Sequence, residues 1–159
     1  MARQFGRYKV STHDDADWRS LTTLQHDVYM SLLSSSDIDW VGVVPYFPAR
    51  FSGFAADLTE RKVEHAWREL ADRGYLVIDK AMGELLVRTF IKHDEVLSHP
   101  NLTKAMLTSL DRVRSAAVRG AIVDELRALS IAKPELRGWG TIRERSPELF
   151  NELFEEAVA

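Results

Sequence analysis

Side chains that can donate hydrogen bonds to phosphates or base edges gather in one segment, DLTERKVEHAWRELADRGYLVI, residues 57–78. Successive residues of an α-helix advance by about 100°. On this spacing Val63, Ala66, Trp67 and Leu70 form one apolar stripe. The opposite side and its flank carry Arg61, Lys62, His65 and Arg68. The DNA major groove admits a helix with such donors on its outer face, so the spacing predicts a helix that contacts DNA.

The same helix also carries acids, which leaves a second interpretation open. Glu64, Glu69 and Asp72 would face or flank the phosphates of bound DNA. Pairs such as Arg61 with Glu64, or Glu69 with Arg73, stabilise a surface helix without binding any partner. The helix therefore either reads DNA or is a solvated helix with the same charge pattern.

Two further segments contain groups that bind metals or transfer protons. HDDAD, residues 13–17, lacks the glycine and the distal glutamate of a calcium loop. KHDEVLSH, residues 92–99, holds His93 and His99, which do not have the four-residue spacing of a helical pair of zinc ligands. The chain contains neither a nucleophile elbow nor a Walker or Rossmann glycine loop. We therefore expect no metal, no cofactor and no enzymatic activity.

Composition limits the classes of function. The 159 residues are 45% hydrophobic, which supports a globular core, and no apolar run approaches the roughly 20 residues that cross a bilayer. The absence of cysteine excludes disulfides and thiolate zinc sites, and it suits the reducing cytoplasm, where we expect the protein to act. A net charge of −3 is unusual for a nucleic-acid binder, so binding must depend on where the basic residues lie.

The expected elements of residues 1–97 follow the order of a winged helix-turn-helix domain. YKVST is expected to be a short strand, HDDADWRSL an acidic turn, and the spacing of Leu21, Leu24, Val28 and Leu32 predicts a helix. A strand (WVGVVPYF), a short helix (PARFSGFAAD) and the donor-bearing helix with Thr59 as N-cap follow. YLVID and ELLVRTFIKH then form a hairpin about KAMG. The prediction is an α+β, mainly helical fold.

The hairpin, which would be the wing, and the N-terminus add basic residues to the predicted DNA contacts. Lys80 lies at the hairpin tip and Arg88 on its second strand, where they can touch the DNA backbone or the minor groove. The N-terminal arm contains only basic charges. The full set of predicted DNA-binding residues is Thr59, Arg61, Lys62, His65, Arg68, Lys80, Arg88, Arg3, Arg7 and Lys9.

Residues 98–159 are expected to form a C-terminal helical extension. LTKAMLTSLDRV and AAVRGAIVDELRAL form two helices, or one helix weakened at Gly120, and AKPELRGWGTIRER is a connector interrupted by proline and glycine. The last helix begins with Ser146 as N-cap and Pro147 as first residue. The predicted partner-binding residues are Trp139, Phe150 and Phe154.

Each of these aromatic side chains has two interpretations. Trp139, which lies among arginines, belongs either to a basic-aromatic contact surface or to a loop anchored on the domain by this side chain. Phe150 and Phe154, one helical turn apart, either pack within the chain or dock in the groove of a partner. A homodimer through these helices would suit DNA binding, because two half-sites compensate for a weakly basic monomer.

Most of the chain resembles one family. The segments KVSTHDDADWRSLTTLQHDVYMSLLSSSDIDWVGVVPY, FAADLTERKVEHAWRELADRGYLVI and LLVRTFIKHDEVLSHPN are similar to winged-helix proteins of actinobacterial phages. They are also similar to the N-terminal domains of phage replication initiators and replisome organisers. The positions that carry this likeness include Trp18, Leu21, Tyr29, Leu32 and Leu33. The resemblance implies a phage-encoded protein that binds double-stranded DNA in replication initiation or transcriptional control.

The alternative function is that of a protein-binding adaptor. Winged helices also serve as scaffolds for protein contacts, so the fold does not by itself decide the function. The wing tip DKAMGE is acidic on balance, which departs from the pattern expected of a DNA contact. Such an adaptor would use its acidic surface to engage and modulate a host replication or transcription protein.

Overall fold

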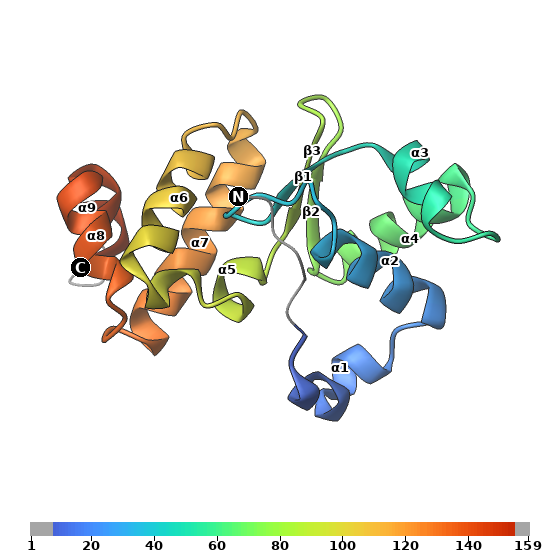
Figure 1. Cartoon of the computed structure of the whole chain (residues 1–159), viewed down its shortest axis with the longest axis horizontal. Helices are drawn as coiled ribbons and strands as arrows, with labels where there is room; N and C mark the ends of the chain where they lie inside the picture. The colour runs from blue at the N-terminus through green and yellow to red at the C-terminus, as the bar shows by residue number, and fades with distance from the viewer. Residues whose placement is uncertain (1–7, 155–159) are drawn as a thin grey trace.

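The computed structural model in Figure 1 describes residues 8–154. Its helices are α1 (Ala16–Arg19), α2 (Thr23–Leu33), α3 (Pro48–Phe51), α4 (Glu60–Asp72), α5 (Phe90–His93), α6 (Pro100–Leu110), α7 (Ala116–Ala132), α8 (Gly138–Arg145) and α9 (Pro147–Phe154). Its strands are β1 (Val43–Pro45), β2 (Leu76–Asp79) and β3 (Glu84–Val87), and short 3₁₀ helices span Val10–Asp14, Ser52–Phe54 and Val96–Ser98. The predicted α+β, mainly helical character is confirmed.

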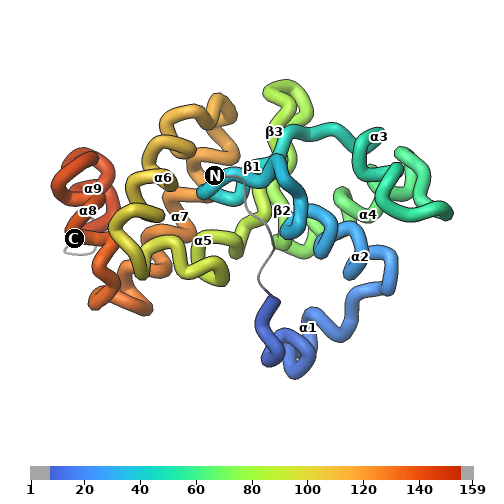
Figure 2. Tube along the Cα trace, viewed as in Figure 1, coloured from blue at the N-terminus to red at the C-terminus, as the bar shows by residue number. Residues whose placement is uncertain are grey.

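A small antiparallel sheet separates two groups of helices. Helices α2, α3 and α4 lie on one side of the sheet and α5–α9 on the other (Figures 1 and 2). Within residues 8–154 the strand order is β1-β3-β2, with Val43 opposite Leu86 and Leu76 opposite Val87. All four residues of the central strand β3 are buried, because helices cover both of its faces. Within the described chain, the buried residues before and after the predicted boundary at residue 97 form one continuous core.

Two carboxylates join the β2–β3 hairpin to the start of α7. Asp79 and Glu84 are cross-strand partners, so their side chains share one face of the sheet. Glu84 accepts hydrogen bonds from the backbone N–H groups of Arg114 and Ser115, both at 3.0 Å. Asp79 accepts one from the hydroxyl of Ser115, the N-cap of α7, at 2.6 Å. The hairpin is therefore fastened to the C-terminal helices.

One apolar stripe holds α4 in place. Val63, Ala66, Trp67 and Leu70 are each 0% exposed, as the spacing predicted. The indole of Trp67 packs edge-on against the ring of Phe51 in α3, with ring centres 5.1 Å apart. Complete burial of this stripe fixes the rotation of α4 about its axis, so the opposite side of the helix faces solvent.

Local signals set both ends of α4. The Thr59 hydroxyl accepts a hydrogen bond from the N–H of Lys62 at 3.2 Å, which confirms the predicted N-cap. Gly74 has a φ of +80°, and the N–H of Tyr75 bonds to the carbonyl of Leu70 at 2.9 Å. This Schellman arrangement needs a left-handed residue, a conformation that glycine adopts without strain.

Two predictions near the N-terminus are wrong. YKVST forms no strand: Val10–Asp14 is a 3₁₀ helix outside the three-stranded sheet, and Val10 is 85% exposed. The predicted acidic turn contains the helix α1. The carboxylate of Asp15 accepts a hydrogen bond from the N–H of Asp17 at 2.8 Å and so caps this helix, and Trp18 is buried beneath it.

The second strand of the hairpin is shorter than ELLVRTFIKH. β3 ends at Val87, which lies opposite the first residue of β2, Leu76, and whose N–H bonds to the carbonyl of Gly42 ahead of β1. Past this point no strand of the described chain continues beside it. Phe90 and Ile91 instead enter the core as the helical turn α5.

The C-terminal region differs from the prediction in its connector. α6 and α7 are separate helices, and Gly120 lies inside α7 without breaking it. The second half of the predicted connector forms α8. A Cβ on Gly138 would lie 2.7 Å from the carbonyl oxygen of Leu97, so this glycine permits close packing and does not mark a loop. α9 begins at Pro147, directly after Ser146, as predicted.

The substitution Glu84→Gln tests the link between the hairpin and α7. Glu84 is 7% exposed, and each of its carboxylate oxygens accepts one backbone N–H. Glutamine keeps a single oxygen and sets its own N–H₂ beside the second donor, so we expect the free energy of unfolding to fall by about 1–3 kcal/mol. Urea denaturation measures the change. Glu144→Gln, at an exposed position of α8, is the control, and its effect should stay within about 0.5 kcal/mol. Equal stability of the two variants would contradict the inferred role of Glu84.

Candidate nucleic-acid interface

The side of α4 that faces away from the core carries a cationic ridge, which we define as Arg61, His65 and Arg68. All three side chains are exposed. Within residues 8–154, neither Arg61 nor Arg68 makes a side-chain hydrogen bond or ion pair. Asp72 is also exposed, at the C-terminal end of the same side. The two arginine side chains are therefore available to a partner.

Glu64 does not face this ridge but turns toward the hairpin. Its Oε1 accepts hydrogen bonds from Nζ of Lys80 at 2.5 Å and from the hydroxyl of Tyr46 at 2.7 Å. The Lys80 ammonium also lies 5.4 Å from the centre of the Tyr46 ring. These contacts hold the pKa of Glu64 below its ordinary value, first through the hydrogen bond from Lys80 and then through that from Tyr46. The expected pair of Arg61 with Glu64 is not formed, because Lys80 takes that place.

Glu69 turns to the other flank of α4. Its Oε2 accepts a hydrogen bond from Nε2 of Gln25 in α2 at 2.9 Å, and its Oε1 lies 3.3 Å from Nε2 of His65. The expected pair of Glu69 with Arg73 is also absent, because Arg73 bonds to the carboxylate of Asp17 at 2.6 Å. Both acidic neighbours are thus engaged: Glu64 by Lys80 and Tyr46, and Glu69 by Gln25 and by His65 of the ridge itself.

The other predicted DNA contacts of the described chain lie off the ridge. Lys80, at the hairpin turn, is bound to Glu64. Arg88 follows β3 and does not lie on it, and its Nε bonds to Oε1 of Glu125 in α7 at 2.8 Å. In the folded chain, both predicted wing cations therefore form ion pairs with acidic side chains of the same chain.

The remaining predicted DNA-binding residues have separate roles. The hydroxyl of Thr59 caps α4, and Nζ of Lys62 bonds to the carbonyl of Asp57 at 2.7 Å, which holds it on the flank. Lys9 lies near His93, where its charge contributes to lowering the pKa of that histidine. Arg3 and Arg7 lie outside the described residues.

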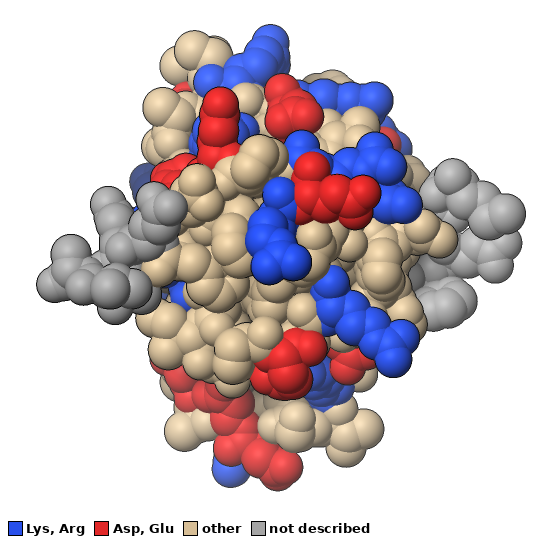
Figure 3. Space-filling model, turned by 90° about the vertical axis from the view of Figure 1, so that its left-hand side faces the viewer, with Lys and Arg blue, Asp and Glu red and all other residues tan. Residues whose placement is uncertain are grey.

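The predicted partner-binding aromatic residues pack within the chain. Trp139 is 4% exposed and donates a hydrogen bond from Nε1 to the Lys133 carbonyl at 2.8 Å, so it anchors α8 on the domain. The Phe154 ring meets it edge-on at 5.6 Å and stacks on the Phe150 ring at 4.4 Å. Figure 3, which faces the C-terminal helices, shows basic and acidic side chains interspersed on this surface. A homodimer through these helices stays a prediction.

Two residues that complete the interface were missed from the sequence. Tyr46 follows β1 and binds Glu64, while Gln25 belongs to a capping box with Thr22 at the start of α2 and binds Glu69. The Thr-x-x-Gln pattern signals the capping box, but nothing in the local sequence connects either residue with α4. Their partners lie 18 and 44 residues away along the chain.

Comparisons with known proteins identify no relative. No protein-family model matches the chain, and neither does any curated protein or solved structure. Among residues 8–154, no group of three or more His, Cys, Asp or Glu side chains is placed to hold a metal ion. In the same part of the chain, no helix has the length and apolar character needed to cross a membrane. The function must therefore be argued from the geometry of the chain itself.

The titration of Glu64 tests its contacts. A lowered pKa in the folded state stabilises the fold above the pKa of the unfolded chain, and the contribution is lost as the pH falls through the folded pKa. We expect the Glu64 carboxyl resonance to titrate at lower pH in the wild type than in Lys80→Met, as measured by NMR. Lys104→Met, at an exposed position of α6, is the matched control and should leave the titration unchanged. The same curve in all three proteins would disprove the pairing.

Proposed function

We propose that the protein is a winged helix-turn-helix protein that binds double-stranded DNA through α4. The proposal is supported by the order of α2, β1, α3, α4 and the β2–β3 hairpin, and by the strand order β1-β3-β2. In this fold α3 and α4 form the helix-turn-helix, α4 is the recognition helix, and the hairpin is the wing. The 3₁₀ turn Ser52–Phe54 and a short loop join the two helices.

The exposed cationic ridge is the observation that carries the proposal. Arg61 lies in the first turn of α4, where recognition helices contact base edges, and Arg68 lies two turns further along. Lys80 pairs with Glu64 on one flank, and Gln25 holds Glu69 on the other, so both carboxylates are turned away from Arg61 and Arg68. A protein of net charge −3 can in this way present a local cationic surface.

For the biological role, the proposal rests on the resemblance described in the sequence analysis and not on the geometry. Phage replication initiators and regulators place a winged helix on duplex DNA, and we propose one of these two roles for this chain. Because phosphate contacts release counterions, the binding should weaken as the salt concentration rises.

Alanine substitutions at Arg61 and Arg68 test the proposal. Each should weaken duplex binding, because each removes a cation from the ridge, and a lost phosphate contact should lower the slope of log K against log salt by about 1. Electrophoretic mobility shifts at two salt concentrations measure both quantities. Arg145→Ala is the matched control, since it removes an exposed arginine from α8 on the far side of the sheet (Figure 1).

Two outcomes would refute DNA binding by α4. One is a wild-type protein that retains no duplex even at low salt. The other is a pair of variants, Arg61→Ala and Arg68→Ala, that bind as tightly as Arg145→Ala and the wild type.

Exposed aromatic side chains favour the adaptor as a second candidate function. Phe47 and Phe54 lie on either side of α3 and are 56% and 50% exposed. Aromatic residues are enriched in the cores of protein interfaces. A pull-down from host lysate separates the two functions: a stoichiometric protein partner that is lost with Phe47→Ser and Phe54→Ser, but kept with Arg61→Ala, favours the adaptor when no DNA is retained.

A further inference from the structure

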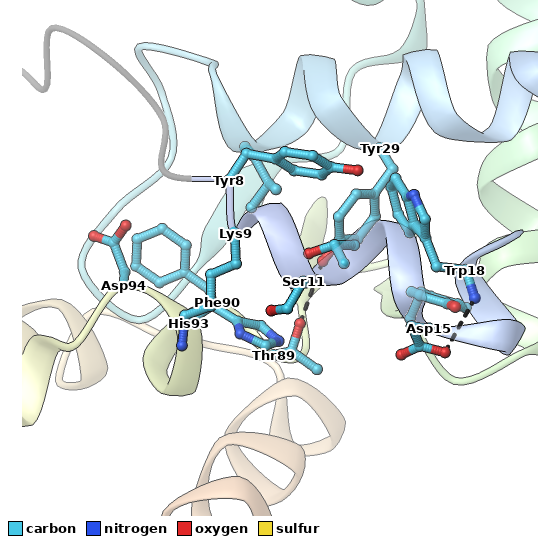
Figure 4. Close-up of a pocket in the computed structure, with 13 residues that line it drawn as sticks. Tyr8, Lys9, Ser11, Asp15, Trp18, Tyr29, Thr89, Phe90, His93 and Asp94 are labelled. Carbon is cyan, nitrogen blue, oxygen red and sulfur yellow. Dashed lines mark hydrogen bonds between the residues drawn. The ribbon is translucent and has the colours of Figure 1, made fainter.

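A cavity of about 230 Å³ lies between the segment around the 3₁₀ helix Val10–Asp14 and the helices α1, α2 and α5 (Figure 4). The cavity is separate from the cationic ridge, because none of the three ridge residues lines it. It also does not depend on the proposed DNA binding, because its occupancy can be measured on the protein alone.

Aromatic rings form much of the wall of this cavity. The rings are those of Tyr8, Trp18, Tyr29, Tyr75 and Phe90. Trp18 and Tyr29 are buried and meet edge-on, with ring centres 5.3 Å apart, and Tyr29 meets Tyr75 in the same way at 5.7 Å. Rings that are fixed at angles to one another can offer both faces and edges to a planar aromatic guest.

The volume limits the size of that guest. An engineered apolar cavity of about 150 Å³ holds benzene, and drug-sized ligands occupy roughly 300–1,000 Å³. A cavity of about 230 Å³ therefore suits one ring with a polar substituent.

Basic side chains border one end of the cavity, together with the carboxylate of Asp94. Lys9 and His93 lie close together there, and Figure 4 shows Trp18 and Asp15 at the opposite end. Partial burial lowers the pKa of His93, as do the nearby charges of Lys9, Lys92 and Lys133. Of these three lysines, Lys9 lines the cavity. Ser11, Thr12 and Thr89 also line the cavity.

Two carboxylates border the same cavity. The Oδ1 of Asp15 accepts a hydrogen bond from the backbone N–H of Asp17 at 2.8 Å. Asp94 is 9% exposed and lies at the end farthest from Trp18 (Figure 4). The side chain of Lys9, like that of Asp15, is exposed, so its ammonium can be reached by a guest that enters from solvent.

We propose that this cavity is a binding site for a small planar aromatic carboxylate. The ring lies among the aromatic side chains, and the carboxylate faces Lys9. Tyr75, whose N–H closes the end of α4, is part of the wall, so a bound ligand touches the residue that ends this helix.

Three probes of similar size distinguish the contribution of the aromatic ring to binding from that of the negative charge. Benzoate carries both features, cyclohexanecarboxylate carries the charge without the aromatic ring, and benzamide carries the ring without the charge. Titration calorimetry on the full chain should give saturable binding of benzoate that is roughly tenfold tighter than that of either analogue.

Variants place the binding in this cavity. Ser11→Phe adds a ring inside the cavity and should abolish benzoate binding. Val10→Phe adds the same ring one residue earlier, at an 85% exposed position that does not line the cavity, and should bind like the wild type. Lys9→Gln should weaken benzoate binding roughly tenfold and leave benzamide binding unchanged.

The proposal is overturned if benzoate shows no saturable binding at millimolar concentration, if all three probes bind equally, or if Ser11→Phe and Val10→Phe bind alike. Circular dichroism checks that each variant is folded. Should Ser11→Phe unfold, the Lys9→Gln protein with the three probes decides: an unchanged affinity for benzoate then overturns the site.

Discussion

The burial of one apolar stripe on α4 determines which surface the protein offers to a partner. Val63, Ala66, Trp67 and Leu70 are removed completely from solvent, and the large indole of Trp67 fits against Phe51 of the neighbouring helix. A helix with such a stripe cannot rotate about its axis without exposing it, at a cost that grows with the apolar area. The outward direction of the arginines on the opposite side is therefore a consequence of core packing, and it does not depend on any attraction between the arginines themselves.

Charge pairing then decides what kind of surface this is. The chain has more acids than bases, and the composition alone argues against a partner made of phosphates. In the folded protein, however, Glu64 and Glu69 are turned to opposite flanks of α4 by Lys80, Tyr46 and Gln25. The same pairing engages Lys80 of the hairpin, and Glu125 engages Arg88. Of the predicted DNA contacts on the helix and the hairpin, Arg61 and Arg68 therefore keep guanidinium groups without an ion pair in the described part of the chain, whereas Lys80 and Arg88 are paired.

Hydrogen bonds from the sheet to α7 fix the position of the hairpin relative to the C-terminal helices. Glu84 and Asp79 lie on the face toward α7 and bind the backbone and hydroxyl groups at the start of that helix. Because β3 is buried on both faces, neither group of helices can shift without disturbing the strand they share. The C-terminal helices are in this sense part of the support of the proposed recognition helix. The aromatic cavity lies next to the C-terminal end of α4, where Tyr75 forms part of the cavity wall.

The sequence by itself determined the features that depend on neighbours a few residues away. The stripe of α4, its N-cap Thr59, its C-terminal Gly74 and the hairpin turn all follow from helical spacing, capping and backbone conformation, which are local properties. Only the tertiary structure decided the partners of Glu64, Glu69 and Arg88, which lie 16, 44 and 37 residues away. It also decided that YKVST has no strand beside it and that Trp139 is a core anchor. Charged side chains on a surface helix have several possible partners of similar energy, so the local sequence does not reveal which ion pair forms. A strand exists only where a neighbouring strand completes its hydrogen bonds, and that neighbour is set by the tertiary structure.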